Sequence, residues 1–104
     1  MPNFTFETYH ECKDFFIARG IKKRSIEYFL AHERYHFNKA LELGYIPLYG
    51  ISCIVDFPPI ILAGFVQFEG RIPQGHDMID ILLAPKHPSQ EDISQVRELE
   101  ASFP

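Results

Sequence analysis

Cysteine is scarce in this sequence, since Cys12 and Cys53 are the only two among 104 residues. Neither lies in a CxxC or Cys-His spacing, so the pattern gives no support to a cysteine-ligated metal. The chain does not open with a charged start followed by an apolar run, so we expect no export signal. Without one, two reduced thiols and a cytoplasmic location are the expectation.

Positive charge and long apolar runs are also limited. Ten Lys and Arg stand against 14 Asp and Glu, for a formal net charge of −4. A general nucleic-acid binder usually carries a basic excess, so we expect no nucleic-acid partner. The only basic run, at 22–24, is interpreted as the solvated start of a helix. The longest apolar run, 58–66, is well short of the ~20 residues of a membrane helix. We therefore expect no membrane partner, and the sequence leaves the oligomeric state open.

What the sequence does contain is enough apolar material for one folded domain over residues 1–104. Apolar residues make up 46% of the chain, with ten Phe and five Tyr. Apolar spacing and glycine stops predict helices at 8–18 and 25–43, a short helix at 77–83 and a last helix at 90–102. Two Ile- and Val-rich segments, 45–57 and 60–69, predict strands. The order indicates an α+β fold with helices packed on a small antiparallel sheet.

The longest predicted helix carries an HExxH motif, His32-Glu33-Arg34-Tyr35-His36. Residues four apart on a helix share a face, with their Cβ atoms about 5–6 Å apart. Both imidazoles can therefore bind one metal ion, at roughly 2.0–2.1 Å for zinc. Glu33 lies about 100° further round the helix, where its carboxylate can reach a metal-bound water without being a ligand. The motif predicts a Zn²⁺ site on His32 and His36, with Glu33 as the general base of a hydrolase.

Two observations keep other interpretations open. The histidines could simply be partly exposed helix residues, with Glu33 paired to a nearby cation such as Arg34. Arg34 also departs from the zinc-protease pattern, which usually has uncharged residues inside the motif. It must point to solvent or pair with an acid.

A catalytic zinc site needs three protein ligands and one open position, so a third ligand must come from elsewhere. Glu42 is on the motif helix but too far along it. The sequence offers further candidates in His10, Glu69, His76, Asp77, His87, Glu91 and Asp92. Ser89 and Asp92 also fit a helix capping box, in which the acid needs no metal.

Segment 89–96, Ser-Gln-Glu-Asp-Ile-Ser-Gln-Val, resembles the Ser-Asn-Asp-Ile/Leu-x-x-Ala stretch of the FtsH-type ATP-dependent zinc proteases. The resemblance covers roughly residues 25–98, and the order of the elements also matches. In that family an Asp on a separate downstream helix is the third zinc ligand, and it falls on Asp92. This chain has no GxxxxGK[ST] phosphate-binding loop, so the resemblance is to an isolated peptidase core.

The chain is also similar to the minigluzincins, single-domain zinc peptidases of about this length. Their third ligand is a downstream Glu, which would fall on Glu91 or Glu98, and His76 remains a further alternative. The resemblance implies a zincin-like fold, Zn²⁺ bound by His32, His36 and Asp92, and hydrolysis of a peptide or protein substrate. Apart from the resemblance, strand 60–69 could lie at the sheet edge beside the metal and take a substrate peptide as an extra strand, or it could be ordinary sheet core. The alternative is a catalytically inactive metal-binding or protein-interaction domain.

Overall fold

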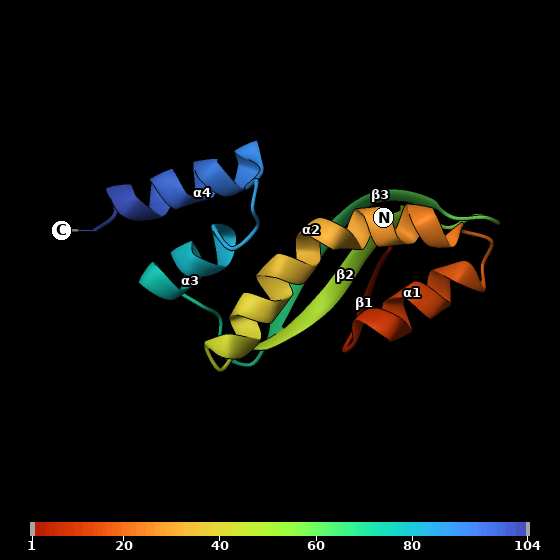
Figure 1. Ribbon diagram of the computed structural model, residues 1–104, viewed down its shortest axis with the longest axis horizontal. Coiled ribbons are helices and arrows are strands. Elements are labelled where there is room, and N and C mark those ends of the chain that lie inside the picture. The colour runs from red at the N-terminus through yellow and green to blue at the C-terminus, as the bar shows by residue number, and fades with distance from the viewer. Residues whose placement is uncertain (1, 104) are drawn as a thin grey trace.

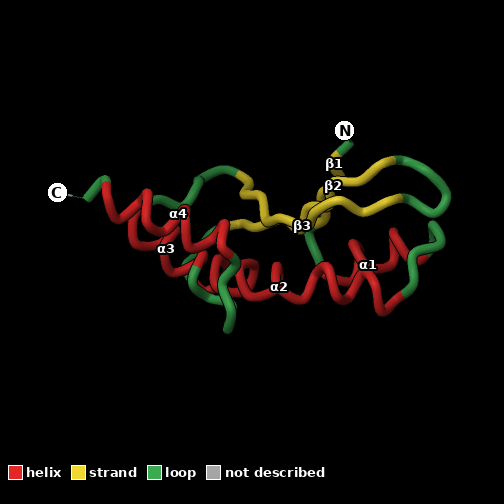
Figure 2. The backbone as a smooth tube through the Cα atoms, turned by 90° about the horizontal axis from the view of Figure 1, so that it is seen from above, coloured by secondary structure: helices red, strands yellow, loops and turns green. Residues whose placement is uncertain are grey.

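A three-stranded antiparallel sheet forms one layer of the computed structural model, which describes residues 2–103 (Figure 1). The strands are β1 (Asn3–Phe6), β2 (Ile46–Ile54) and β3 (Ile60–Glu69), in the order β1-β2-β3. The helices α1 (Tyr9–Ile17) and α2 (Lys23–Glu42) cover one face of this sheet (Figure 2). The predicted α+β class is therefore confirmed. Residues 1 and 104 of the predicted domain lie outside the described residues.

The helix boundaries follow local signals in the sequence. Thr8 caps α1, because its side-chain oxygen accepts from the backbone N–H of Glu11 at 3.1 Å. The helix α2 begins at Lys23, two residues before the predicted start at Ser25, and has no side-chain cap. It ends before Gly44, whose φ of +87° lies in the left-handed region that favours glycine. Within residues 2–103, no helix combines the length and apolarity needed to cross a membrane.

The first strand was not predicted. The four residues of β1 pair with β2 from Asn3 opposite Ser52 to Phe6 opposite Tyr49. Phe4 and Phe6 pack against the core on the helix side of the sheet. A strand of four residues with two apolar side chains gives too weak an alternation to be recognised from sequence.

The core between sheet and helices orients the motif helix. Phe37 of α2 stacks on Tyr49 of β2, with ring centroids 4.1 Å apart and planes 6° apart. Burying such side chains contributes about 1.5–3 kcal/mol each. The buried cluster consists of Cys12, Phe16, Ile26, Leu30, Phe37, Tyr49, Ile51 and Cys53. Because these contacts hold one side of α2 on α1 and the sheet, another side is left for α3 (Gly75–Leu82), on which α4 (Gln90–Ala101) packs.

No helix among the described residues covers the other face of the sheet (Figure 2). One aromatic ring covers part of this face. Gly50 in β2 is paired with Phe65 in β3. A Cβ atom built on Gly50 would lie 2.2 Å from the Phe65 ring, so the ring occupies the space above this glycine. A glycine inside a strand commonly marks such a close approach.

Candidate metal centre

The helix α2 carries His32 and His36 on successive turns, and the structure fixes the second ring firmly. His36 is buried, and its Nδ1 donates to the backbone carbonyl of Ile81 in α3 at 2.7 Å. A carbonyl oxygen can only accept a hydrogen bond, so Nδ1 must carry the proton of this ring. Nε2 of His36 is therefore free to face the centre of the site. A backbone carbonyl on the second ring nitrogen is the usual support of a metal-binding histidine.

The first turn of α4 brings Asp92 to the same place. Ser89 is the N-cap: its Oγ accepts from the backbone N–H of Asp92 at 3.0 Å. In return, the Asp92 carboxylate accepts from the backbone N–H of Ser89 at 3.0 Å, which completes a capping box. The capping interpretation of Asp92 is thus confirmed. The cap also serves the site, because it holds this buried carboxylate pointing at the two histidines.

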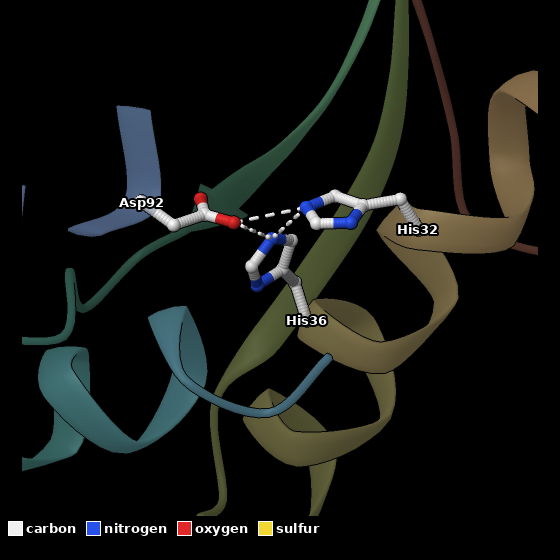
Figure 3. Close-up of side chains that lie close together, drawn as sticks. All are labelled: His32, His36 and Asp92. Atoms are coloured by element: carbon white, nitrogen blue, oxygen red, sulfur yellow. Dashed lines mark hydrogen bonds and ion pairs between the residues drawn. The ribbon is translucent and has the colours of Figure 1, made fainter. Parts of the chain in front are cut away.

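Three ligand atoms converge from the two helices (Figure 3). Nε2 of His32 lies 2.9 Å from Oδ2 of Asp92 and 3.1 Å from Nε2 of His36. Nε2 of His36 lies 3.3 Å from the same oxygen. Tetrahedral zinc with bonds of about 2.0–2.1 Å places its ligand atoms roughly 3.3 Å apart. The observed triangle is slightly tighter than this, so only small side-chain movements separate it from a zinc-binding arrangement.

The distribution of protons in this triangle also favours a cation. With Nδ1 donating to Ile81, neutral His36 presents only a lone pair at Nε2. That lone pair faces a carboxylate oxygen of Asp92 at 3.3 Å, and two acceptors at this distance repel. Nε2 of His32 lies 2.9 Å from the Asp92 oxygen and 3.1 Å from Nε2 of His36, so a proton on it can be shared with these two acceptors. A metal ion in the centre would be an alternative partner for all three atoms. The residues His32, His36 and Asp92 therefore form a group that could hold a metal ion.

Glu33 lines the same pocket without joining the triangle. Its Cγ lies 3.3 Å from where a Cβ on Gly64 of β3 would be, so the side chain packs against the edge strand. Burial raises the pKa of Glu33 to about 7, and the negative charges of Asp92 and Glu91 add to the effect. A carboxyl with a pKa near neutrality is suited to general acid–base work.

Arg34 points away from the site. Its guanidinium lies 4.3 Å from the centroid of the Tyr9 ring, at the N-terminal end of α1. This is a cation–π contact, which is neither of the two expected arrangements, exposure to solvent or pairing with an acid. The arginine inside the motif therefore packs on the opposite side of α2 and leaves the pocket free of positive charge.

The other candidate ligands are engaged elsewhere or lie outside the triangle. Asp77 accepts from the Tyr45 hydroxyl at 2.5 Å, and the His76 ring packs on Phe103 with centroids 4.8 Å apart. Glu42 pairs with Lys39 at 3.0 Å. His87 and Glu91 line the pocket, but neither joins the metal-binding group found within residues 2–103. The remaining candidates, His10, Glu69 and Glu98, also lie outside that group.

Two contributors to the site were missed by sequence reasoning. The Ile81 carbonyl that supports His36 leaves no trace in the sequence, because any residue supplies a carbonyl. Gly64, which gives Glu33 room beside β3, had a signal: it interrupts the apolar run Ile-Ile-Leu-Ala-Gly-Phe-Val. A glycine in such a run indicates a close approach by another part of the chain.

No protein-family model matches the chain, and no significant match is found among curated proteins or solved structures. The function is therefore argued from the site's own geometry.

Proposed function

We propose that this domain binds a divalent metal ion, zinc in the first instance, through His32, His36 and Asp92 and acts as a small HExxH metallopeptidase. The observation that carries the proposal is the meeting of two helices at one point. The histidines of α2 meet a carboxylate that lies 60 residues further along the chain from His32, within hydrogen-bonding distance. Chance spacing of His and Glu in a sequence does not produce such a meeting.

The surroundings of the triangle support catalysis as well as metal binding. The pocket has a volume of about 430 Å³ and opens to solvent. Apolar side chains, Phe68, Met78 and Leu82, form part of its wall, and His87 and Gln95 add polar groups. A cleft in which apolar walls meet several convergent polar groups can bind a substrate and fix its orientation.

The proposed chemistry assigns one task to each group of the chain. A divalent ion bound here would lower the pKa of a water ligand and polarise a substrate carbonyl. His32, His36 and Asp92 would hold the ion, and the Ile81 carbonyl keeps His36 in the required tautomer. Glu33 would take the proton of the attacking water and return it to the departing amine. In the metal-free protein burial already raises the pKa of this carboxyl to about 7, which marks Glu33 as the group at this pocket suited to exchanging a proton.

The edge strand supports the same proposal. In the order β1-β2-β3, β3 has no further strand on its outer side within residues 2–103. Glu33 and the histidines share a pocket with Gly64, Phe65 and Val66 of this strand. A substrate peptide that pairs with β3 would bring its backbone carbonyls close to the triangle. The arrangement agrees with the resemblance to an isolated FtsH-type core or a minigluzincin, and we propose a zincin-like fold on this basis.

The test is the variant Glu33→Gln, assayed with zinc-loaded protein and a mixed fluorogenic peptide library. The account predicts unchanged zinc content and a loss of turnover of about 10²–10⁴-fold. Glu27→Gln, the same substitution on α2 but outside the pocket, is the matched control and is expected to retain most activity. Zinc bound by both proteins, with no turnover in the wild type and therefore no effect of Glu33→Gln, would instead indicate a catalytically inactive metal-binding domain.

A further inference from the structure

Two loops far apart in the sequence form one end of the elongated molecule. The turn between β2 and β3 and the link between α1 and α2 lie together there, opposite to α3 and α4 (Figures 1 and 2). The contact is direct: a Cβ on Gly20 of the link would lie 3.2 Å from Cβ of Pro58 in the turn. The molecule measures 49 × 25 × 25 Å, so this end is well separated from the α4 end.

The turn exposes large apolar side chains at its extremity. Val55 is 66% exposed and Phe57 is 77% exposed, and Ile60 at the start of β3 is 51% exposed. We call these three residues the apolar tip. Pro58 and Pro59 stiffen the turn that carries them. Folding gains nothing from leaving a Phe and two branched residues together in water, so their clustering calls for a partner.

The adjoining link is basic. Arg19 and Lys22 lie in the link, and Lys23 and Arg24 are the first two residues of α2. All four are exposed, and we call them the basic link. None of the four takes part in an ion pair among the described residues. The two segments 17–28 and 54–62 contain only Glu27 and Asp56 as acids, whereas the whole chain has a net charge of −4. Positive charge is thus concentrated next to the apolar tip.

We propose that this end of the molecule binds the surface of a membrane that contains anionic lipids. The apolar tip enters the boundary between headgroups and acyl chains, and the basic link contacts the lipid phosphates. The pairing of apolar side chains with adjacent Lys and Arg is the composition that interfacial binding requires. A nucleic acid would match the basic link but offers no hydrocarbon to the apolar tip. The sequence-based expectation of no membrane partner rested on the absence of a long apolar run that could span a membrane. The present proposal concerns binding to the membrane surface and revises that expectation.

The proposal is independent of the metal centre. The triangle involves the middle of α2 and the first turn of α4, away from the β2–β3 turn (Figure 1). Binding through the tip would therefore leave the pocket open to solvent, and loss of the metal would not abolish it.

The experiment is vesicle flotation of the full chain at low salt. Neutral phosphatidylcholine vesicles are compared with vesicles that contain about 30 mol% phosphatidylglycerol. This fraction of anionic lipid gives a strong negative surface potential. We expect binding to the anionic vesicles that weakens as salt is added, because salt screens the charges of the basic link. The double variant Lys22→Glu/Lys23→Glu should bind at least ten-fold more weakly, since each basic residue near such a surface contributes about five-fold.

The apolar contribution is tested by Val55→Ser/Phe57→Ser, which should lower binding by about ten-fold or more at every salt concentration. Matched controls are Ile72→Ser, at an apolar side chain that is 62% exposed elsewhere, and Arg97→Glu on α4. Circular dichroism checks that each variant is folded, and His36→Ala should bind vesicles as the wild type does.

Absence of binding to anionic vesicles at low salt would overturn the proposal, as would equal losses in the tip variants and their controls. A dimer seen by light scattering and lost in Val55→Ser/Phe57→Ser, without vesicle binding, would identify the tip as a contact between copies of the chain and would equally overturn it.

Discussion

Nε2 of His32 lies 2.9 Å from Oδ2 of Asp92, although the two residues are 60 positions apart and belong to different helices. This relationship joins the HExxH helix to the start of α4. The same carboxylate closes the capping box with Ser89, so one side chain both begins a helix and completes the triangle. The two roles of Asp92 predict different consequences for different substitutions.

Asp92→Asn and Ser89→Ala separate these roles. Asparagine keeps a side-chain oxygen that can accept from the Ser89 N–H but removes the negative charge, so metal affinity should fall by at least about ten-fold. The stability of the metal-free protein should change little. Ser89→Ala removes only the hydroxyl cap and should cost about 1 kcal/mol of unfolding free energy.

Zinc titration and urea unfolding in the presence of a chelator measure the two effects. If Asp92→Asn lowered the unfolding free energy while leaving zinc affinity intact, Asp92 would be a capping residue and not a ligand.

The raised pKa of Glu33 predicts a pH-dependent stability. Burial, with the charges of Asp92 and Glu91, raises this pKa from 4.5 to about 7 in the folded, metal-free protein. The folded state therefore binds the proton more tightly than the unfolded state. As the pH rises from about 4.5 to about 7, the contribution of Glu33 to the free energy of unfolding should decline, by roughly 3 kcal/mol at most. Above pH 7 it should stay constant.

Glu33→Gln removes this titration. The difference in unfolding free energy between Glu33→Gln and wild type, measured with chelator present, should grow in favour of the variant across the same pH range. A difference that stays flat from pH 4.5 to pH 7 would show that Glu33 has no raised pKa.

The contact between Gly50 and Phe65 predicts the effect of a small enlargement in β2. A methyl group at Gly50 would meet the Phe65 ring at 2.2 Å, so the ring must move away from the sheet. Gly50→Ala should therefore lower the unfolding free energy by about 1–3 kcal/mol. Adding Phe65→Leu should recover part of that loss in a double-mutant cycle, whereas strictly additive effects would contradict the proposed contact.

Sequence patterns accounted for most of the fold because most elements carry their own local signals. The apolar stripe and the glycine stop of α2 gave that helix to within two residues, and Ser89 marked the start of α4. The strand β1 was not predicted because its four residues carry no clear strand pattern of their own and form a strand only by pairing with β2.

The site also has one part that local sequence patterns predict and another part that they do not. The pair His32 and His36 follows from helical spacing alone. The placement of Asp92 beside them required a family resemblance, because no local rule brings α4 to α2. The Ile81 carbonyl and the packing of Arg34 on Tyr9 depend on tertiary contacts and left no pattern in the sequence.

The most direct test of the metal centre is metal analysis of the natively purified protein by mass spectrometry, beside the variants His36→Ala and His87→Ala. His87 lies at the pocket but outside the triangle, so it is the matched control. The account predicts about one divalent ion, zinc first, per chain in the wild type and in His87→Ala, and a loss of that ion in His36→Ala. A metal-free wild type that also fails to take up added zinc, or equal metal content in all three proteins, would contradict it.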